Sequence, residues 1–148
     1  IEYSPLTASY LKLITNKIKH NSGGILIVDY GYLDKKIKNT LQTVSKHKYS
    51  DILENFGKSD ITYNLSFYLT EKIIKKFGSF NSITTSQKNF LIKLGILKRA
   101  EILSKNMPFT KKADIYFRIK RLIDKNAMGD LFKVMLITNK NNKFQQGF

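Results

Sequence analysis

The stretch Gly23-Gly24-Ile25-Leu26-Ile27-Val28-Asp29-Tyr30-Gly31-Tyr32 decides the fold. Residues 25–28 are continuously apolar rather than alternating, which is typical of a strand covered on both faces of a parallel sheet. The two glycines favour the end of a helix, because glycine readily adopts the left-handed conformation found there. The stretch therefore predicts a helix, a glycine turn and a buried strand, which together form a unit of an α/β fold.

An amphipathic helix is predicted directly before these glycines. Its apolar residues recur at steps of three and four along one helical face: Leu6, Tyr10, Leu13, Ile14 and Ile18. We expect this stripe to be the buried face of the helix, with the lysines mostly outside it.

The chain after the strand divides into a loop and a series of short elements. Residues 32–60 have no sustained period, and we expect a long loop with a short helix. Hydrophobic spacing predicts helices at 65–77, 87–95, 97–105 and 111–126 and strands at 80–84 and 131–138. Met128-Gly129 is expected to end the last helix, and the polar tail at 139–148 is expected to be frayed.

Composition excludes several kinds of protein. The 148 residues can bury one substantial core, and the lack of cysteine excludes disulfides and Cys-ligated metals, so we expect no metal. The formal charge of +15 suits an anionic partner, but a bias toward lysine codons explains much of it and does not favour nucleic acid. No apolar run reaches the roughly 20 residues of a membrane span, and we expect a cytoplasmic protein.

Asp29, Tyr30 and Gly31 form the first candidate site, because they directly follow the predicted strand. Ligands of open α/β sheets bind at the carboxyl ends of the parallel strands. A structural role has equal weight, with Asp29 capping a loop and the Tyr30 side chain packing.

A second group of candidates comprises His47, Asp60, Thr62 and Gln87. A histidine transfers protons near neutral pH, and a carboxylate can orient a cationic substrate through paired hydrogen bonds. The alternatives are a solvated histidine and, for Gln87, a capping role at a helix start. Because no glycine-rich phosphate loop or nucleophile motif is present, the residues by themselves indicate only half of an α/β nucleotide-type fold.

Several ordered blocks of this sequence resemble one known family. Residues 23–32 resemble the GG-x-x-L-I-x-D-Y-G-Y signature of the MidA-like family of class I S-adenosylmethionine-dependent methyltransferases. The other resembling blocks follow the family order at Glu2–Pro5, Thr40–Thr62, Thr85–Ile96 and Met128–Val134. Ile52, Phe56 and Ser86 depart from the family pattern in loops, and the glycine-rich cofactor loop of the family is absent from this chain.

The resemblance implies an α/β fold, namely the C-terminal half of a Rossmann-like class I methyltransferase sheet. Residues 1–148 would be the C-terminal part of a single methyltransferase domain, with a loop insertion at 31–62 after the DYG strand. Residues 25–29 would form a parallel strand beside the missing half. Residues 80–85 would form an outer strand, and 131–138 would form an antiparallel strand between the two.

The resemblance also implies an activity, which is protein-arginine N-methylation linked to respiratory complex I assembly, with S-adenosylmethionine as cofactor. The implied site residues lie at the strand end, in the loop that closes over it or at the start of a later helix: Asp29, Tyr30 and Asp60 would be catalytic, and Gly31, His47, Thr62 and Gln87 would bind substrate.

The cofactor-binding residues would lie upstream of this chain. The missing N-terminal half is therefore one expected partner. The others are a protein substrate, such as a complex I subunit, and a second copy of the chain. Because the sequence opens on Ile1 rather than Met, we expect a fragment or the product of a split gene. Two other hypotheses stay open, a non-catalytic basic binding module and an inactive remnant, and an upstream glycine-rich loop would argue against both.

Overall fold

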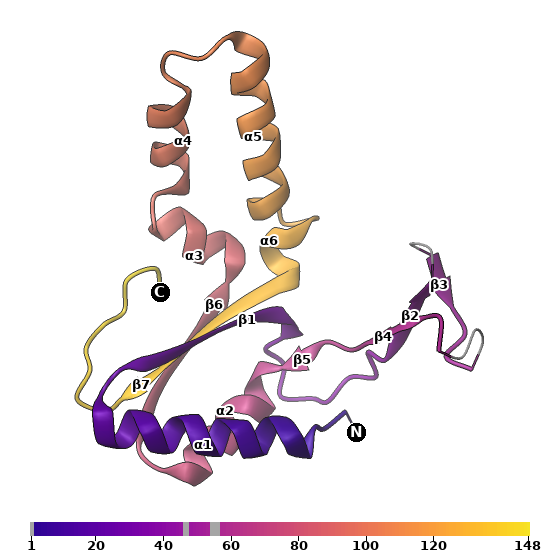
Figure 1. The fold of residues 1–148 in the computed structure, drawn as a ribbon, viewed down its shortest axis with the longest axis vertical. Helices are drawn as coiled ribbons and strands as arrows, with labels where there is room; N and C mark the ends of the chain where they lie inside the picture. The colour runs from indigo at the N-terminus through magenta and orange to yellow at the C-terminus, as the bar shows by residue number, and fades with distance from the viewer. Residues whose placement is uncertain (1, 46–47, 54–56) are drawn as a thin grey trace.

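The main sheet contains four strands in the order β5-β1-β7-β6 (Figure 1). The computed structural model that shows it describes residues 2–45, 48–53 and 57–148. The strands are β1 (Gly24–Tyr32), β5 (Leu65–Ser66), β6 (Phe80–Ser86) and β7 (Phe132–Asn139). β7 lies antiparallel between β1 and β6, and β5 adds parallel to the end of β1. The predicted fold class and the predicted antiparallel strand between two others are confirmed.

Two helices cover one face of this sheet, α1 (Pro5–Asn21) and α2 (Phe67–Phe77). The core brings Leu11 of α1 and Phe67 and Ile74 of α2 against Met135 and Ile137 of β7. α1 begins where the Ser4 hydroxyl accepts a hydrogen bond from the backbone N–H of Thr7, with Pro5 at the first helical position. This helical layer fixes which face of β1 is buried.

The opposite face of β1 is open, which corrects the expectation of a strand covered on both sides. Leu26 and Val28 of this face are 51% and 48% exposed. The edge of β1 is also open along most of its length, because β5 pairs only with Gly31 and Tyr32. Among the described residues, the apolar run of β1 is thus half exposed on one face and unpaired along most of one edge.

The apolar stripe predicted for the first helix is also largely exposed, so that prediction was wrong. α1 buries Leu11, Thr15 and Ile18, while most of the predicted stripe faces outward: Leu6, Tyr10, Leu13 and Ile14. Thr15 fits the buried face because its hydroxyl donates to the backbone carbonyl of Leu11 at 2.7 Å. The helix therefore has two apolar stripes, and the one that contains Thr15 packs against the sheet.

A set of short helices follows β6: α3 (Gln87–Lys93), α4 (Ile96–Ser104), α5 (Phe109–Ile123) and α6 (Met128–Leu131). α4 and α5 form a hairpin that projects from the sheet (Figure 1). α5 ends at Ile123, and the Asp124 carbonyl then accepts hydrogen bonds from the backbone N–H groups of Ala127 and Gly129. The turn starts a new helix at Met128, so Met128-Gly129 does not end the preceding helix as predicted.

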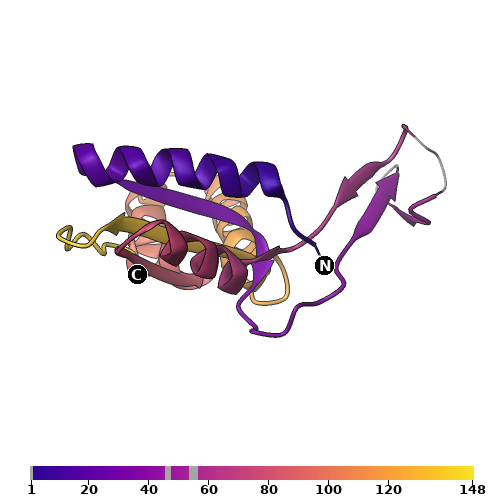
Figure 2. The ribbon, with the colours of Figure 1, turned by 90° about the horizontal axis from the view of Figure 1, so that it is seen from below.

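The segment between β1 and β5 carries a second sheet, not the predicted loop with a short helix. Its strands are β2 (Gln42–Ser45), β3 (Lys48–Ser50) and β4 (Asp60–Thr62), in the order β3-β2-β4. We call residues 33–64 the arm, and Figures 1 and 2 show it extending away from the main sheet. Strands of three or four residues are too short to give a clear alternating pattern in sequence.

The C-terminal tail returns to the helices rather than fraying as predicted. The ring of Phe148 lies 5.2 Å from that of Phe90 on α3, and Gly147 is buried beside it. Within the described residues, no helix is both long enough and apolar enough to cross a membrane.

Candidate functional site

The candidate site lies where β1 and β6 reach their carboxyl ends on the same side of the sheet. Asp29 of β1 and Ser86 of β6 both pair with Lys133 of β7, one from each side. Directly opposed residues of antiparallel strands project to the same face, so Asp29, Lys133 and Ser86 form one row across the sheet. This row brings a carboxylate and an ammonium group to the edge where α/β sheets bind ligands.

Asp29 and Tyr30 combine a structural role with exposure. The Asp29 carboxylate accepts a hydrogen bond from the backbone N–H of Tyr30 at 2.8 Å, and the Tyr30 ring lies 4.2 Å from that of Phe132. The packing alternative is therefore realised for Tyr30, whereas Asp29 bonds to the next residue within β1 and caps no loop. Both side chains are nevertheless exposed, which leaves the second carboxylate oxygen and the phenol accessible to a ligand.

Gly31 is required by close packing at the junction of β1, β5 and α2. A Cβ atom at this position would lie 2.3 Å from the backbone carbonyl oxygen of Leu65 and 2.6 Å from the ring of Phe67. Such distances are far below van der Waals contact, so only glycine lets the two strands approach this closely. Gly31 fixes where the arm returns to the sheet, directly beside Asp29 and Tyr30.

Lys133 belongs to this edge, although the sequence did not single it out as a site residue. Its ammonium group donates to the backbone carbonyl of Asp130. Burial lowers the pKa of Lys133, the nearby Asp130 carboxylate opposes that shift, and Lys38 adds to it by repulsion. The available signal was its position as the one charged residue of an otherwise apolar strand.

The base of the arm is held by a junction of three segments. The Glu2 carboxylate accepts hydrogen bonds from the backbone N–H and the hydroxyl of Thr40, both at 2.6 Å. The Thr40 hydroxyl oxygen in turn accepts from the backbone N–H of Asn64 at 2.9 Å. Burial alone would raise the pKa of Glu2, but the hydrogen bonds from Thr40 and Leu41 outweigh it and lower that pKa. One carboxylate therefore ties both ends of the arm to the start of the chain.

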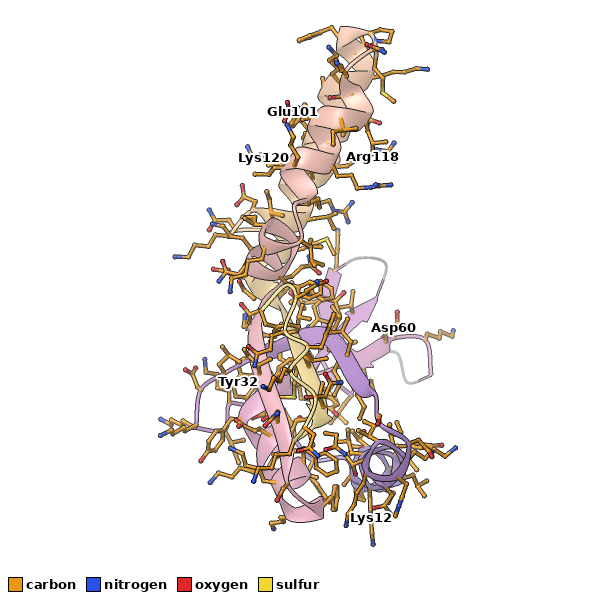
Figure 3. The ribbon with its side chains drawn as sticks, turned by 90° about the vertical axis from the view of Figure 1, so that its left-hand side faces the viewer. Lys12, Tyr32, Asp60, Glu101, Arg118 and Lys120 are labelled. Atoms are coloured by element: carbon orange, nitrogen blue, oxygen red, sulfur yellow. The ribbon has the colours of Figure 1, made fainter. Side chains whose placement is uncertain are left out.

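The remaining predicted site residues are distributed between the arm and the helices. Asp60 is exposed on β4, away from the main sheet (Figure 3). Thr62 lies on the same strand, and its hydroxyl accepts a hydrogen bond from the amide of Gln42 at 3.2 Å. His47 lies outside the described residues. The structure thus joins Asp60 and Thr62 on the arm but does not pack them against Asp29.

Gln87 follows Ser86 at the same edge, but its side chain turns toward the helices. It is buried, and its amide donates to the backbone carbonyl of Leu122 on α5 at 2.9 Å. This bond ties the first turn of α3 to the end of α5. The helix-capping role belongs to Ser86, whose hydroxyl accepts from the backbone N–H of Asn89.

Residues 1–84 match the family described as S-adenosyl-L-methionine-dependent methyltransferases. The chain belongs to this family. A COG1565 superfamily protein from Burkholderia thailandensis has the same fold over 99% of this chain and 40% of its own, with a TM-score of 0.83 and 19% identity. Another from the same organism, solved with S-adenosyl-homocysteine bound, covers 95% of this chain and 38% of its own, with a TM-score of 0.74 and 22% identity.

Curated relatives of this chain are named as mitochondrial proteins. The Xenopus tropicalis protein arginine methyltransferase NDUFAF7 is 28% identical over 90% of this chain and 31% of its own length. The Caenorhabditis elegans homologue is 30% identical over 66% of this chain and 23% of its own. The chain thus spans about a third or less of these relatives. Their names contradict the predicted cytoplasmic location, which was wrong because it rested on absent signals alone.

The residues of this chain do not form a complete cofactor site. A class I cofactor pocket needs a glycine-rich loop between a strand and the N-terminus of a helix, where backbone N–H groups face the ligand. Here β1 leads into the arm, and β6 leads into α3 through Ser86 and Gln87 without a glycine. The residues present therefore do not fit the cofactor by themselves. In the described part of the chain, no three His, Asp or Glu side chains are grouped as metal ligands.

Proposed function

We propose that this chain is the C-terminal, substrate-facing portion of an S-adenosylmethionine-dependent protein-arginine methyltransferase. The observation that carries the proposal is the exposed Asp29–Tyr30 pair at the carboxyl end of β1, beside an arm whose base is fixed by Glu2. The arginine methyltransferases named among the relatives support the substrate class. A role in complex I assembly is part of the same proposal.

The chemistry assigned to this portion is the positioning of a guanidinium group. Methyl transfer from a sulfonium is an in-line displacement, so alignment of the nucleophile accounts for much of the acceleration. A carboxylate suits a guanidinium because it can accept two parallel N–H bonds from the planar fork. Asp29 is the first candidate for this role, with Tyr30 and Gly31 beside it at the strand end.

The arm supplies the second group of substrate contacts in this proposal. It carries Asp60, Thr62 and His47, and closing it over the strand end would bring Asp60 toward a substrate held by Asp29. Gln87 contributes to substrate binding indirectly, since its hydrogen bond to the Leu122 carbonyl positions α3 at the carboxyl end of β6. The cofactor loop comes from another part of the protein.

That other part would pack against the open side of this chain. β1 leaves most of one edge unpaired, and its open face bears Leu26 and Val28. The outward stripe of α1, which includes Leu6 and Leu13, adds further exposed apolar surface. An apolar edge strand invites pairing with another strand, so we propose that the missing N-terminal half completes the sheet here. A second copy of the chain is the alternative occupant.

The test is arginine methylation by the chain assembled with its N-terminal half, comparing Asp29→Asn with Asp114→Asn. Both substitutions remove an exposed carboxylate, but Asp114 pairs with Arg118 on the α5 shaft. Losing a charge-assisted hydrogen bond to the substrate should lower kcat/KM about 10- to 100-fold for Asp29→Asn only. Equal activity of the two variants would remove Asp29 from the mechanism. Activity absent from the assembled wild type would favour a non-catalytic module.

A further inference from the structure

The α4–α5 hairpin exposes apolar side chains that the sheet does not use. α5 buries no residue along its whole length, although it contains several large apolar side chains. Phe109 at its start is 84% exposed, and Phe117 on its shaft is 74% exposed. The hairpin stands away from β1 and α1, so it forms a surface separate from the open edge described above (Figure 1).

The end of this hairpin combines apolar groups with uncompensated positive charge. We define the tip as residues 102–113, which contain three lysines and neither aspartate nor glutamate. Its exposed apolar side chains surround the connection between the helices and are Ile102, Leu103, Met107 and Phe109. Lysine is common throughout this chain, so its number alone is not informative. The combination with clustered exposed apolar groups distinguishes the tip from an ordinary solvated face.

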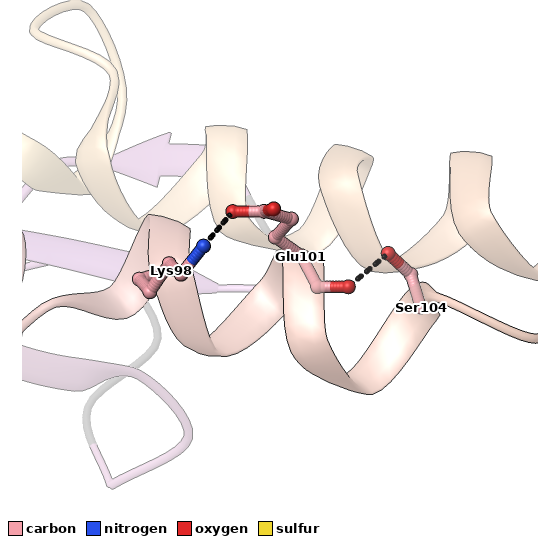
Figure 4. A network of polar contacts seen from close by, with 3 residues as sticks. All are labelled: Lys98, Glu101 and Ser104. Atoms are coloured by element: carbon pink, nitrogen blue, oxygen red, sulfur yellow. Dashed lines mark hydrogen bonds and ion pairs between the residues drawn. The ribbon is translucent and has the colours of Figure 1, made fainter.

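The acidic side chains nearest the tip are already paired on the shafts. Lys98 and Glu101 form an ion pair at 2.8 Å, and the Ser104 hydroxyl donates to the Glu101 carbonyl (Figure 4). Asp114 pairs with Arg118 at 2.9 Å. Among the ion pairs of the described residues, none involves a tip lysine. The positive charge of the tip is therefore available to an external anionic partner.

We propose that the tip docks on the surface of an anionic lipid bilayer. Exposed Phe and aliphatic side chains flanked by lysines match the chemistry of an interface, where apolar groups enter the acyl boundary and ammonium groups meet phosphates. A second copy of the chain would place two positive tips against each other. Nucleic acid would use the lysines but would leave Ile102, Leu103 and Met107 in water.

The experiment measures how much of the full chain sediments with lipid vesicles. Neutral vesicles of phosphatidylcholine are compared with vesicles that also contain about 30% phosphatidylglycerol, which gives them an anionic surface. Wild type should bind the anionic vesicles only, and more weakly as salt is raised. Lys105→Glu/Lys111→Glu should weaken binding at least about 25-fold, since each lysine contributes about fivefold. Lys72→Glu/Lys76→Glu on α2 makes the same charge change far from the tip and should have a small effect.

A second pair of variants tests the apolar contribution. Phe109→Ser should weaken vesicle binding about tenfold or more, whereas Tyr49→Ser on β3, which removes a ring that is 78% exposed, should not. Far-UV circular dichroism checks that all variants keep the wild-type helix content. Equal losses in both charge variants, no binding to anionic vesicles, or binding of a single-stranded RNA in place of vesicles would overturn the proposal.

Discussion

Replacing Gly31 by alanine tests the packing that places the arm beside the strand end. The new Cβ would lie 2.3 Å from the Leu65 carbonyl oxygen and 2.6 Å from the ring of Phe67. Ordinary contact begins at 3.4 Å, so β5 must move by about 1 Å or more to make room. That movement disrupts both register pairs between β1 and β5 and shifts Phe67, a core residue that is 1% exposed.

The expected loss is about 3 kcal/mol of unfolding free energy. Weakened strand pairing contributes about 1 kcal/mol, and displacement of Phe67 contributes about 2 kcal/mol. Urea unfolding followed by far-UV circular dichroism measures this loss as a lower midpoint at an unchanged slope. Gly95→Ala is the control, because Gly95 has a φ of +81° but open space around it, and only about 1 kcal/mol is expected there. A loss below about 0.5 kcal/mol for Gly31→Ala would refute the close approach of β1 and β5.

Three further predictions concern contacts that the structure adds to the sequence. Glu2→Gln should lower the free energy of unfolding by about 1 kcal/mol at pH 7, measured by urea unfolding. Because folding lowers the pKa of Glu2, the wild type should lose this advantage over the variant as the pH falls through that lowered pKa. Thr40→Val breaks the same junction, and limited proteolysis should then cleave the arm faster while the sheet core stays protected. Gln87→Leu leaves the Leu122 carbonyl without its donor and should lower the free energy of unfolding by about 1–3 kcal/mol in the same urea assay. Gln87→Glu should be no better, because a carboxylate cannot donate.

Local signals predict the main strands one by one, and the family resemblance predicts their order. The apolar run before Asp29, the glycine turn and the final strand with its single lysine each identify one element. Their order along the chain, together with the family resemblance, then gives the antiparallel strand between two others. Asp29, Tyr30 and Gly31 were expected to follow the strand directly, but β1 continues to Tyr32, so the sequence located this strand without locating its end.

Other features depend on contacts between distant residues and have no local signal. The exposed stripe of α1 repeats as regularly as its buried one, so periodicity cannot choose between Leu13 and Leu11. The short arm strands pair across separations that no sequence pattern encodes. Gln87 stands at a helix start, where a capping role is expected from sequence. Its side chain instead donates to the backbone carbonyl of Leu122, a contact that no local pattern indicates.

Calorimetric binding of S-adenosyl-homocysteine, measured on the chain alone and on the chain assembled with its N-terminal half, tests the proposed function most directly. We expect no binding to the chain alone, because β1 and β6 lead into no glycine-rich loop, and saturable binding to the assembly. Binding by the isolated chain would contradict the assignment of the cofactor loop to another part of the protein. A folded assembly that does not bind would contradict the methyltransferase function itself.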